Sequence, residues 1–330
     1  MSGNQDNGQE LAERLIKNAW ENRRLAFSYL FFGPAGTGRL FMARKLAKTV
    51  NCEVGSFPPC LVCSSCKKIE SNNHPDVHYI EKQNSSFIKI EQIHDMQREI
   101  FLHPFEAKYK VFIVMNAEDL TAEAANCLLK ILEESPKDSL IILIASDLRR
   151  IFPTIVSRCQ KVMFNTRDPK QLESILKDNY HLDINLSHFL SFIFEGRLGE
   201  ALRFKDRNTL NEKNRIIGCF MPQIFANLSH NAWQMPGEHN KFDYKDKDEL
   251  NWIIKILVTC VRDVYLIKIG SDKNKLINQD IRGELSVLAG ELSFADLDQI
   301  LKQLCDAREL IQQNVNPRLL IENLKLLWRK

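Results

Sequence analysis

The chain has 330 residues, of which 45 are lysine or arginine and 42 are aspartate or glutamate, so its formal charge is +3. This length predicts two or three domains, and a charge so close to neutral gives no argument for binding a polyanion. The first ten residues are polar and no apolar run approaches the length of a membrane span, so we expect a soluble, cytoplasmic protein without membrane contact.

The first half of the chain predicts strands that alternate with helices. An amphipathic helix is expected at 11–24, with Leu11, Leu15, Ile16 and Trp20 on its apolar face. Strands are expected at 29–32, 77–80, 110–115, 140–145 and 161–164, and further helices at 40–51, 90–101 and 121–134. Because these strands are almost wholly apolar, we expect a parallel sheet covered by helices on both faces.

A glycine-rich loop follows the first expected strand and has the spacing of a phosphate-binding P-loop. It contains Gly33, Gly36 and Gly38, and a helical pattern follows it. In a working P-loop a lysine reaches the outer phosphates and a serine or threonine hydroxyl holds Mg²⁺. Here Arg39 and Leu40 occupy those two positions. Since leucine offers no oxygen to a metal, we expect the loop to be degenerate and not to bind ATP.

The second element of nucleotide hydrolysis is also missing. An ATPase of this type carries an aspartate, and often a glutamate, after its central strand. At that place this sequence has Met115 and Asn116, while Glu118 and Asp119 come two or three residues later. We expect those acids at the start of the next helix rather than on a metal. The altered P-loop and the missing acidic residue after the central strand thus both predict that this chain does not hydrolyse nucleotide.

Four cysteines form the strongest local motif. Cys52, Cys60, Cys63 and Cys66 have the pattern C-x7-C-x2-C-x2-C, whereas the other five cysteines are scattered. Four thiolates close together suit tetrahedral zinc and leave no open coordination position for catalysis. The sequence therefore predicts a structural Zn²⁺ site that stabilises an excursion at about 52–73. Free thiols and an iron–sulfur cluster are the alternatives.

The helix at 121–134 predicts a core-facing stripe. Thr121 is its expected N-cap, and Lys130 is its exposed member. The stripe is formed by Leu128, Leu129, Ile131 and Leu132. The stripe is explained by packing alone, so direct DNA contact through Lys130 is not part of our interpretation.

Beyond residue 166 the pattern becomes helical to the end of the chain. Asp168 and Pro169 occupy the N-cap and first-turn positions of a helix. We expect an α/β domain at 1–166, a helical lid at 167–207 and a helical C-terminal domain at 208–330. A polar stretch at 234–249 is expected to be a solvated loop or disordered insertion.

Arg158 lies in the sequence Ser157-Arg158-Cys159, which we place after the fourth strand. One interpretation is an ordinary surface charge. The other is an arginine finger, a guanidinium inserted into a neighbouring nucleotide site to neutralise charge that develops on the phosphoryl group. The residue alone does not decide between the two.

Several motifs together resemble a known family. They are Tyr29-Leu30-Phe31, Gly33-Pro34-x-Gly36-x-Gly38, the four cysteines, His74-Pro75-Asp76-Val77, the helix Asn126 to Glu134, Ser157-Arg158-Cys159 and the tail Asn316 to Leu324. In this order the set resembles the delta-prime family of bacterial DNA polymerase III clamp-loader subunits. The resemblance is close over about 135 residues and extends to the helical tail.

The resemblance implies an AAA+ protein with an α/β module, a lid and an oligomerising collar. It implies a non-catalytic, stator-like subunit in a hetero-pentamer with delta and gamma or tau subunits, which loads the sliding clamp onto primed DNA as part of the DNA polymerase holoenzyme. It also implies that Arg158 acts in trans on ATP held by a neighbour, that the four cysteines bind zinc, and that Gly199 replaces a sensing arginine of motor subunits.

Two other functions remain open at this point. A gamma or tau-type motor would share the cysteines, the helix at 126–134 and Arg158, but requires the lysine, hydroxyl and acidic residues that are missing here. A zinc-bearing nucleic-acid-binding module outside any replication assembly would bind DNA by itself in a salt-sensitive way.

Overall fold

The computed structural model describes residues 10–83, 85–206, 208–224, 247–313, 315–316 and 319–320. The chain divides into two compact units. The first comprises residues 1–167 with 197–200, and the second comprises 168–196 with 201–330. The expected insertion at 234–249 and the tail motif at 316–324 lie largely outside the described residues.

The first unit is built on a parallel sheet of five strands. In sheet order these are β2 (Val77–Ile80), β3 (Lys110–Val114), β4 (Ser139–Ala145), β1 (Ser28–Phe32) and β5 (Gln160–Met163). Each expected strand is present within one residue of its expected ends, and β5 begins and ends one residue earlier than expected. The register aligns Ser28 with Ile141 and Tyr29 with Gln160.

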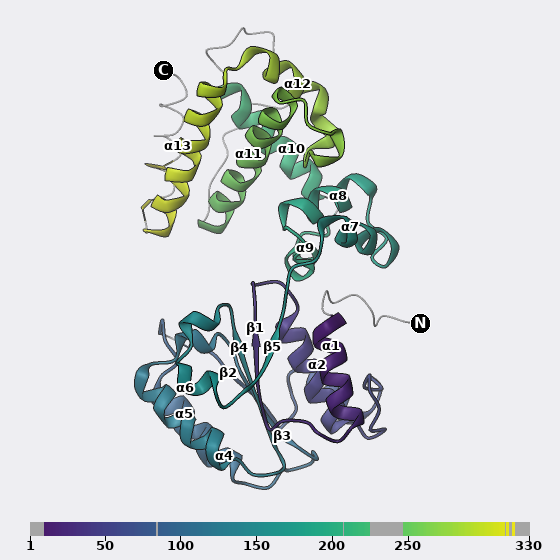
Figure 1. Ribbon diagram of the computed structural model, residues 1–330, viewed down its shortest axis with the longest axis vertical. Helices are drawn as coiled ribbons and strands as arrows, with labels where there is room; N and C mark the ends of the chain where they lie inside the picture. Colours follow the sequence, from purple (N-terminus) through teal and green to yellow (C-terminus); the bar gives the residue numbers. More distant parts are fainter. Residues whose placement is uncertain are drawn as a thin grey trace. The chain divides into compact units, whose positions relative to one another are not determined.

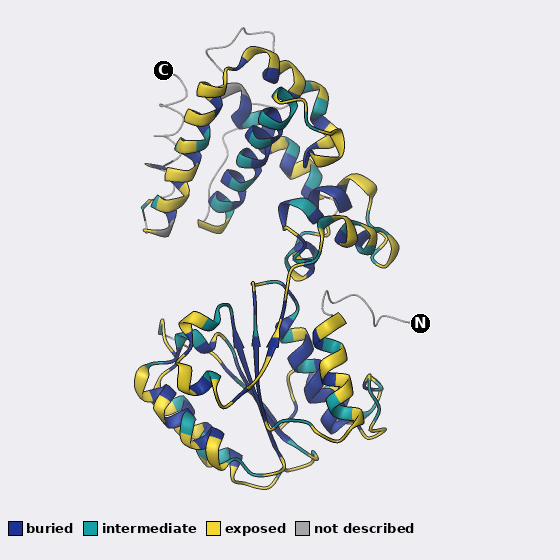
Figure 2. Cartoon of the chain, viewed as in Figure 1, coloured by how far each residue is buried: buried dark blue, intermediate teal, exposed yellow. Residues whose placement is uncertain are grey.

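Helices cover both faces of this sheet (Figure 1), so the predicted α/β fold class is confirmed. One face carries α1 (Glu10–Glu21) and α2 (Arg39–Asn51), and the other carries α4 (Ile90–Ile100), α5 (Ala122–Glu134) and the short α6 (Pro153–Val156). Each face encloses its own apolar core. The strands β1, β3 and β4 are buried between helices whose outer sides are exposed, whereas the edge strand β5 is largely exposed (Figure 2).

Short elements connect these helices and strands. The cysteine-rich excursion contains α3 (Ser64–Glu70), and the 3-10 helices η1 (Ala117–Asp119) and η2 (Leu148–Arg150) follow β3 and β4. Thr121 caps α5 as expected, because its Oγ1 accepts a hydrogen bond from the Ala124 N–H at 3.2 Å. Lys130 is exposed on this helix.

Two sequence expectations for the first unit are wrong in detail. In α1 the buried residues are Ala12 and Ile16, whereas Leu11 and Leu15 are 62% and 48% exposed. A single helical row contacts the core, so the neighbouring row of leucines faces outward. The helix α6, which we did not expect, separates β4 from Arg158, because Pro153 provides a first-turn residue that starts a helix.

The second unit is helical throughout its described residues. Its elements are α7 (Pro169–Asp178), α8 (Ile184–Ile193), α10 (Asn208–Ile224), α11 (Lys247–Lys268), η3 (Lys273–Lys275), η4 (Gln279–Ile281), α12 (Arg282–Glu291) and α13 (Phe294–Gln312), with α9 (Leu198–Arg203) at the boundary between the units. Asp168 caps α7 as expected, accepting from the Lys170 N–H at 2.8 Å. Among the described residues no helix is long and apolar enough to cross a membrane.

Charged residues are buried within this helical unit. Lys213 on α10 is fully buried, and its Nζ lies 2.6 and 2.7 Å from the two carboxylate oxygens of Asp280. Asp263 on α11 is also fully buried and accepts hydrogen bonds from the backbone N–H groups of Ile277 and Asn278. Both acids thus hold the segment between η3 and α12 against the long helices.

Candidate functional site

The glycine-rich loop lies between β1 and α2, where a P-loop belongs. Gly33, Gly36 and Gly38 have φ angles of 142°, 77° and 89°. A Cβ atom at Gly33 would lie 1.9 Å from the backbone oxygen of Phe164, so no side chain fits there. The loop therefore has the backbone of a phosphate-binding motif.

Arg39, at the lysine position of the motif, is turned into the protein. Its Nη1 donates a hydrogen bond to the backbone oxygen of Ala145 at the end of β4, and the residue is only 9% exposed. Burial lowers the pKa of the Arg39 guanidinium, while the negative charge of Glu118 opposes this shift. The cation is thus engaged by a backbone carbonyl of the sheet.

The acidic residues after β3 are engaged as well. Glu118 Oε1 accepts hydrogen bonds from the backbone N–H, at 3.0 Å, and the hydroxyl of Ser146. Asp119 Oδ2 lies 2.9 Å from Lys82 Nζ. Asn116, where a motor would carry an acidic metal ligand, has a φ of 50° and precedes η1. These contacts agree with the expectation that both acids lie at the start of the next element.

Residues 197–200, which belong to the first unit, lie against the loop. The Gly199 N–H donates a hydrogen bond of 2.9 Å to the backbone oxygen of Gly36. A Cβ atom at Gly36 would lie 2.5 Å from Cγ of Glu200. This approach places a carboxylate-bearing side chain beside the loop, which is unfavourable for a phosphate there.

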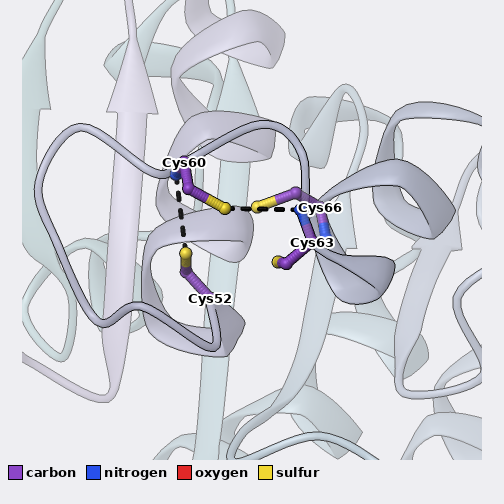
Figure 3. A group of neighbouring side chains, drawn as sticks. All are labelled: Cys52, Cys60, Cys63 and Cys66. Atoms are coloured by element: carbon purple, nitrogen blue, oxygen red, sulfur yellow. Dashed lines mark hydrogen bonds between the residues drawn. The ribbon is translucent and has the colours of Figure 1, made fainter.

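The four predicted cysteines come together beyond the end of α2 (Figure 3). The sulfur atoms of Cys52, Cys60, Cys63 and Cys66 all lie within 4.8 Å of one another. Four sulfurs bound tetrahedrally to zinc would be about 3.8 Å apart, given a Zn–S distance of about 2.3 Å. The donor set and its spacing therefore fit Zn²⁺, and the cluster could bind it.

Backbone N–H groups support these sulfurs. The N–H groups of Cys60, Cys63 and Cys66 donate to the sulfurs of Cys52, Cys60 and Cys63 at 3.5, 3.4 and 3.5 Å. Although burial raises the pKa of Cys52, hydrogen bonds from Cys60 and from backbone N–H groups outweigh it and lower the pKa to about 6. The thiolate form, which ligates metals, is favoured at this sulfur.

The His74-Pro75-Asp76 motif links the cysteine excursion to a surface loop. The Nδ1 atom of His74 accepts a hydrogen bond from the Asp76 N–H, so its Nε2 donates to the hydroxyl of Ser65 on α3 at 3.1 Å. The Asp76 carboxylate accepts from the N–H groups of Phe105, Glu106 and Ala107 at 2.7, 2.9 and 2.9 Å. The motif is structural in this unit.

Arg158 lies in the turn between α6 and β5, with its side chain 37% exposed. Its Nε donates to Glu133 Oε1 at 2.8 Å and its Nη1 to the backbone oxygen of Thr154 at 3.0 Å. The hydroxyl of Ser28 donates to the Arg158 backbone oxygen at 2.9 Å, which fixes the turn against β1. The guanidinium is therefore held at the surface by the Glu133 carboxylate and the Thr154 backbone oxygen.

The sequence matches two family models. The model described as DNA polymerase III, delta subunit matches residues 8–168, and the model described as DNA polymerase III, delta subunit, C terminal matches residues 220–330. A relative described as DNA polymerase III subunit delta' of Bacillus subtilis (strain 168) is 32% identical over 317 residues, which are 96% of this chain and 95% of that protein. The chain belongs to the delta-prime family of DNA polymerase III clamp-loader subunits.

This delta-prime family member is also similar to a tau subunit over part of that protein's length and to a solved structure over nearly all of its chain. The DNA polymerase III subunit tau of Escherichia coli (strain K12) is 32% identical over 206 residues, or 61% of this chain and 32% of that protein. A solved structure described as a DNA polymerase III, gamma subunit-related protein from Thermotoga maritima covers 96% of this chain and 98% of its own, with 16% identity and a TM-score of 0.48. The assignment to the delta-prime family rests on the sequence relatives.

The sequence alone did not predict the hydrogen bonds that Arg39 and Gly36 of the glycine-rich loop make in this family member. The partners of Arg39 and Gly36 are Ala145 and Gly199, which lie more than 100 residues away along the chain. The only signal in the sequence was that Arg39 and Leu40 replace the lysine and the hydroxyl residue of the motif. Ser146, which holds Glu118, carries no local pattern that would have predicted it.

Proposed function

We propose that this chain is a clamp-loader subunit that does not hydrolyse ATP. In this proposal it is a stator-like member of a hetero-pentamer with delta and gamma or tau subunits, which loads the sliding clamp onto primed DNA. The observation that carries the proposal is the hydrogen bond between the buried Arg39 guanidinium and the Ala145 backbone oxygen. Arg39, the residue that would contact phosphate, instead donates a hydrogen bond to the backbone of its own chain.

The residues that would hold a magnesium ion are also missing or already engaged. Leu40 has no oxygen ligand, and the acids nearest to β3 are engaged by Ser146 and Lys82. MgATP needs a hydroxyl directly after the lysine of the motif and an acidic group near the metal to hold its cation. Leu40, which follows Arg39, carries no hydroxyl, and the hydroxyl of Thr37 in the loop already donates to the Pro34 backbone oxygen at 2.7 Å.

Equilibrium binding of a labelled ATP analogue to the isolated full chain tests this part of the proposal. We expect no Mg²⁺-dependent binding tighter than a Kd of about 1 mM. Tight, Mg²⁺-dependent binding would instead favour the alternative of a gamma or tau-type motor, which the similarity to tau proteins keeps as the second candidate.

In the proposed complex, Arg158 supplies an arginine finger to ATP bound by an adjacent gamma or tau subunit. Its side chain is partly exposed and its only carboxylate partner among the described residues is Glu133, itself half-exposed. Such a surface ion pair is worth about 0–1 kcal/mol and is readily exchanged for a phosphate oxygen.

The test is Arg158→Ala in the reconstituted clamp loader. We expect turnover at the adjacent site to fall by about 10³–10⁵-fold, so the total ATPase rate falls by the share of that one site. Arg158→Lys should rescue poorly, since an ammonium lacks the planar fork. Arg14→Ala, which removes another exposed arginine in a single ion pair, is the matched control. Unchanged turnover in Arg158→Ala would contradict the finger assignment.

The four cysteines are proposed to hold a structural Zn²⁺. We expect one zinc per chain by elemental analysis, and we expect a strong chelator to increase hydrogen exchange in residues 52–73 while β3 and β4 stay protected. Cys60→Ser with Cys63→Ser should reproduce this effect. Cys305→Ser, at an exposed thiol outside the cluster, is the control. A metal-free chain with unchanged exchange in 52–73 would count against a structural role.

A further inference from the structure

A pocket of about 410 Å³ opens between α2 and the cysteine-bearing excursion, apart from the contacts of Arg39. Its apolar lining comes from Leu40 and Phe41 on α2 and from Pro59 and Leu61 of the excursion. Its polar lining includes Arg44, Lys45, Lys48 and Glu70. Pockets of this size suit a small ligand or the side chains of a short peptide.

The charges of the pocket leave one cation without a carboxylate in hydrogen-bond contact. Lys45 is paired with Glu13 and Lys48 with Glu70. Arg44 has no such pair, and its Nε is buried with no hydrogen-bond partner among the described residues. A buried donor left unpaired is unfavourable. Arg44, which lines the pocket, thus brings to it a guanidinium that no carboxylate of the described residues pairs by hydrogen bonding.

The surroundings of Arg44 hold its guanidinium in place. Its central carbon lies 5.5 Å from the centre of the Tyr79 ring, a cation–π distance. The hydroxyl of Tyr79 is likewise buried without a hydrogen-bond partner among the described residues. The aromatic ring thus orients a planar donor that is suited to two oxygens of a carboxylate.

The rim of the pocket exposes large apolar side chains. Phe41 is 46% exposed and Leu61 is 50% exposed. Leu61 also has a φ of 62°, a left-handed conformation that is unfavourable for a non-glycine residue. Backbone strain of this kind gathers at binding sites, where the surrounding structure maintains it. Here the turn between Cys60 and Cys63 maintains the strain and presents the leucine at the surface.

We propose that this pocket binds a short segment of a partner protein in which one carboxylate stands beside a large apolar side chain. One guanidinium remains after the two lysine pairs, so a single negative charge is the complement. A nucleic-acid backbone would need a row of uncompensated cations. The apolar rim provides the contact area for the neighbouring side chain.

The test uses the full, zinc-loaded chain and a panel of fluorescently labelled pentapeptides that place one aspartate next to leucine, phenylalanine or tryptophan. Fluorescence anisotropy should show that at least one binds about tenfold more tightly than its asparagine analogue. Arg44→Gln and Phe41→Ala should each weaken that binding at least about tenfold, and Arg44→Lys should do so less. Lys67→Gln, an exposed site on α3 outside the pocket, should have no effect.

Three results would overturn the proposal. They are a panel in which no peptide prefers the unmodified chain over Arg44→Gln, equal weakening by Lys67→Gln, and complete displacement by millimolar inorganic phosphate, which would identify a small-anion site. Zinc content and thermal unfolding of each variant verify that it is folded. Phe41→Ala, at an exposed position, provides the second variant if Arg44→Gln fails to fold. None of these results depends on nucleotide binding or on Arg158.

Discussion

Single buried polar residues determine the shape of the surface loops in the first unit. Asp76 is 1% exposed and accepts three backbone hydrogen bonds from residues 105–107. Burial alone raises the pKa of this carboxyl, but the three N–H groups outweigh that effect and hold the pKa below its ordinary value. The charged form of Asp76 therefore stabilises the folded state.

Asp76→Asn should lower the free energy of unfolding at neutral pH by about 1–3 kcal/mol. Because the folded pKa is depressed, the stabilisation is complete well above the ordinary carboxyl pKa of 3.8 and is lost as the pH falls below that value and through the lower folded one. Urea unfolding across this interval should show a shallower decline for Asp76→Asn than for the unmodified chain. Parallel curves would show that this carboxylate is not the linked group.

At the scale of whole elements, the buried pair Lys213–Asp280 joins α10 to the segment that precedes α12. Lys213 is fully buried, whereas the Asp280 side chain is 21% exposed. Removal of the acid leaves an ammonium in the core without its counter-ion, and breaking a buried pair in this way costs about 3–5 kcal/mol. Removal of the lysine leaves a carboxylate that reaches water.

We therefore expect Asp280→Asn to destabilise the chain more than Lys213→Met does. The double variant should be more stable than Asp280→Asn alone, because the methionine fills the same space without a charge. Thermal unfolding of the four proteins forms a double-mutant cycle that measures this order. Equal losses in the two single variants would contradict the role assigned to burial.

The elements themselves could be predicted from the sequence to a large extent. Apolar runs gave the five strands, and the caps Thr121 and Asp168 marked two helix starts. The outward orientation of Leu11 and Leu15 could not be predicted, because periodicity identifies an apolar stripe but not which of its rows meets a neighbour. The spacing of the cysteines predicted their convergence, since the short steps along the chain leave the sulfurs few other positions.

The contacts that occupy the P-loop could not be predicted, for a physical reason. Arg39 finds its acceptor at the end of β4, and Gly36 meets residue 199. Such pairings depend on how distant segments pack, which no local pattern encodes. The loss of the lysine and hydroxyl residues predicted a defective loop, but not what would take the place of the ligand.

At the scale of the whole molecule, the proposed inability to hydrolyse ATP has several causes that act together. Arg39→Lys combined with Leu40→Thr restores two residues of the motif. We expect ATP turnover by this variant to remain at background, because Met115 and Asn116 supply no acidic group and Glu118 is held by Ser146.

Phosphate release by the purified variant and by the unmodified chain, each without other subunits, measures this expectation. An authentic tau or gamma subunit assayed in parallel is the positive control. Sustained turnover by either form of this chain would show that the missing acidic group is not required, and the motor assignment would then replace the proposed one.

The hydrogen bond from Gly199 to Gly36 ties the glycine-rich loop to a later segment of the same chain. A motor reshapes its loop whenever the ratio of ATP to ADP changes, whereas this loop is already tied to its own polypeptide. In the proposed assembly its geometry would stay constant through every cycle of the neighbouring motors. A change in the ratio of ATP to ADP would then alter the conformations of the neighbouring motor subunits but not the loop of this chain.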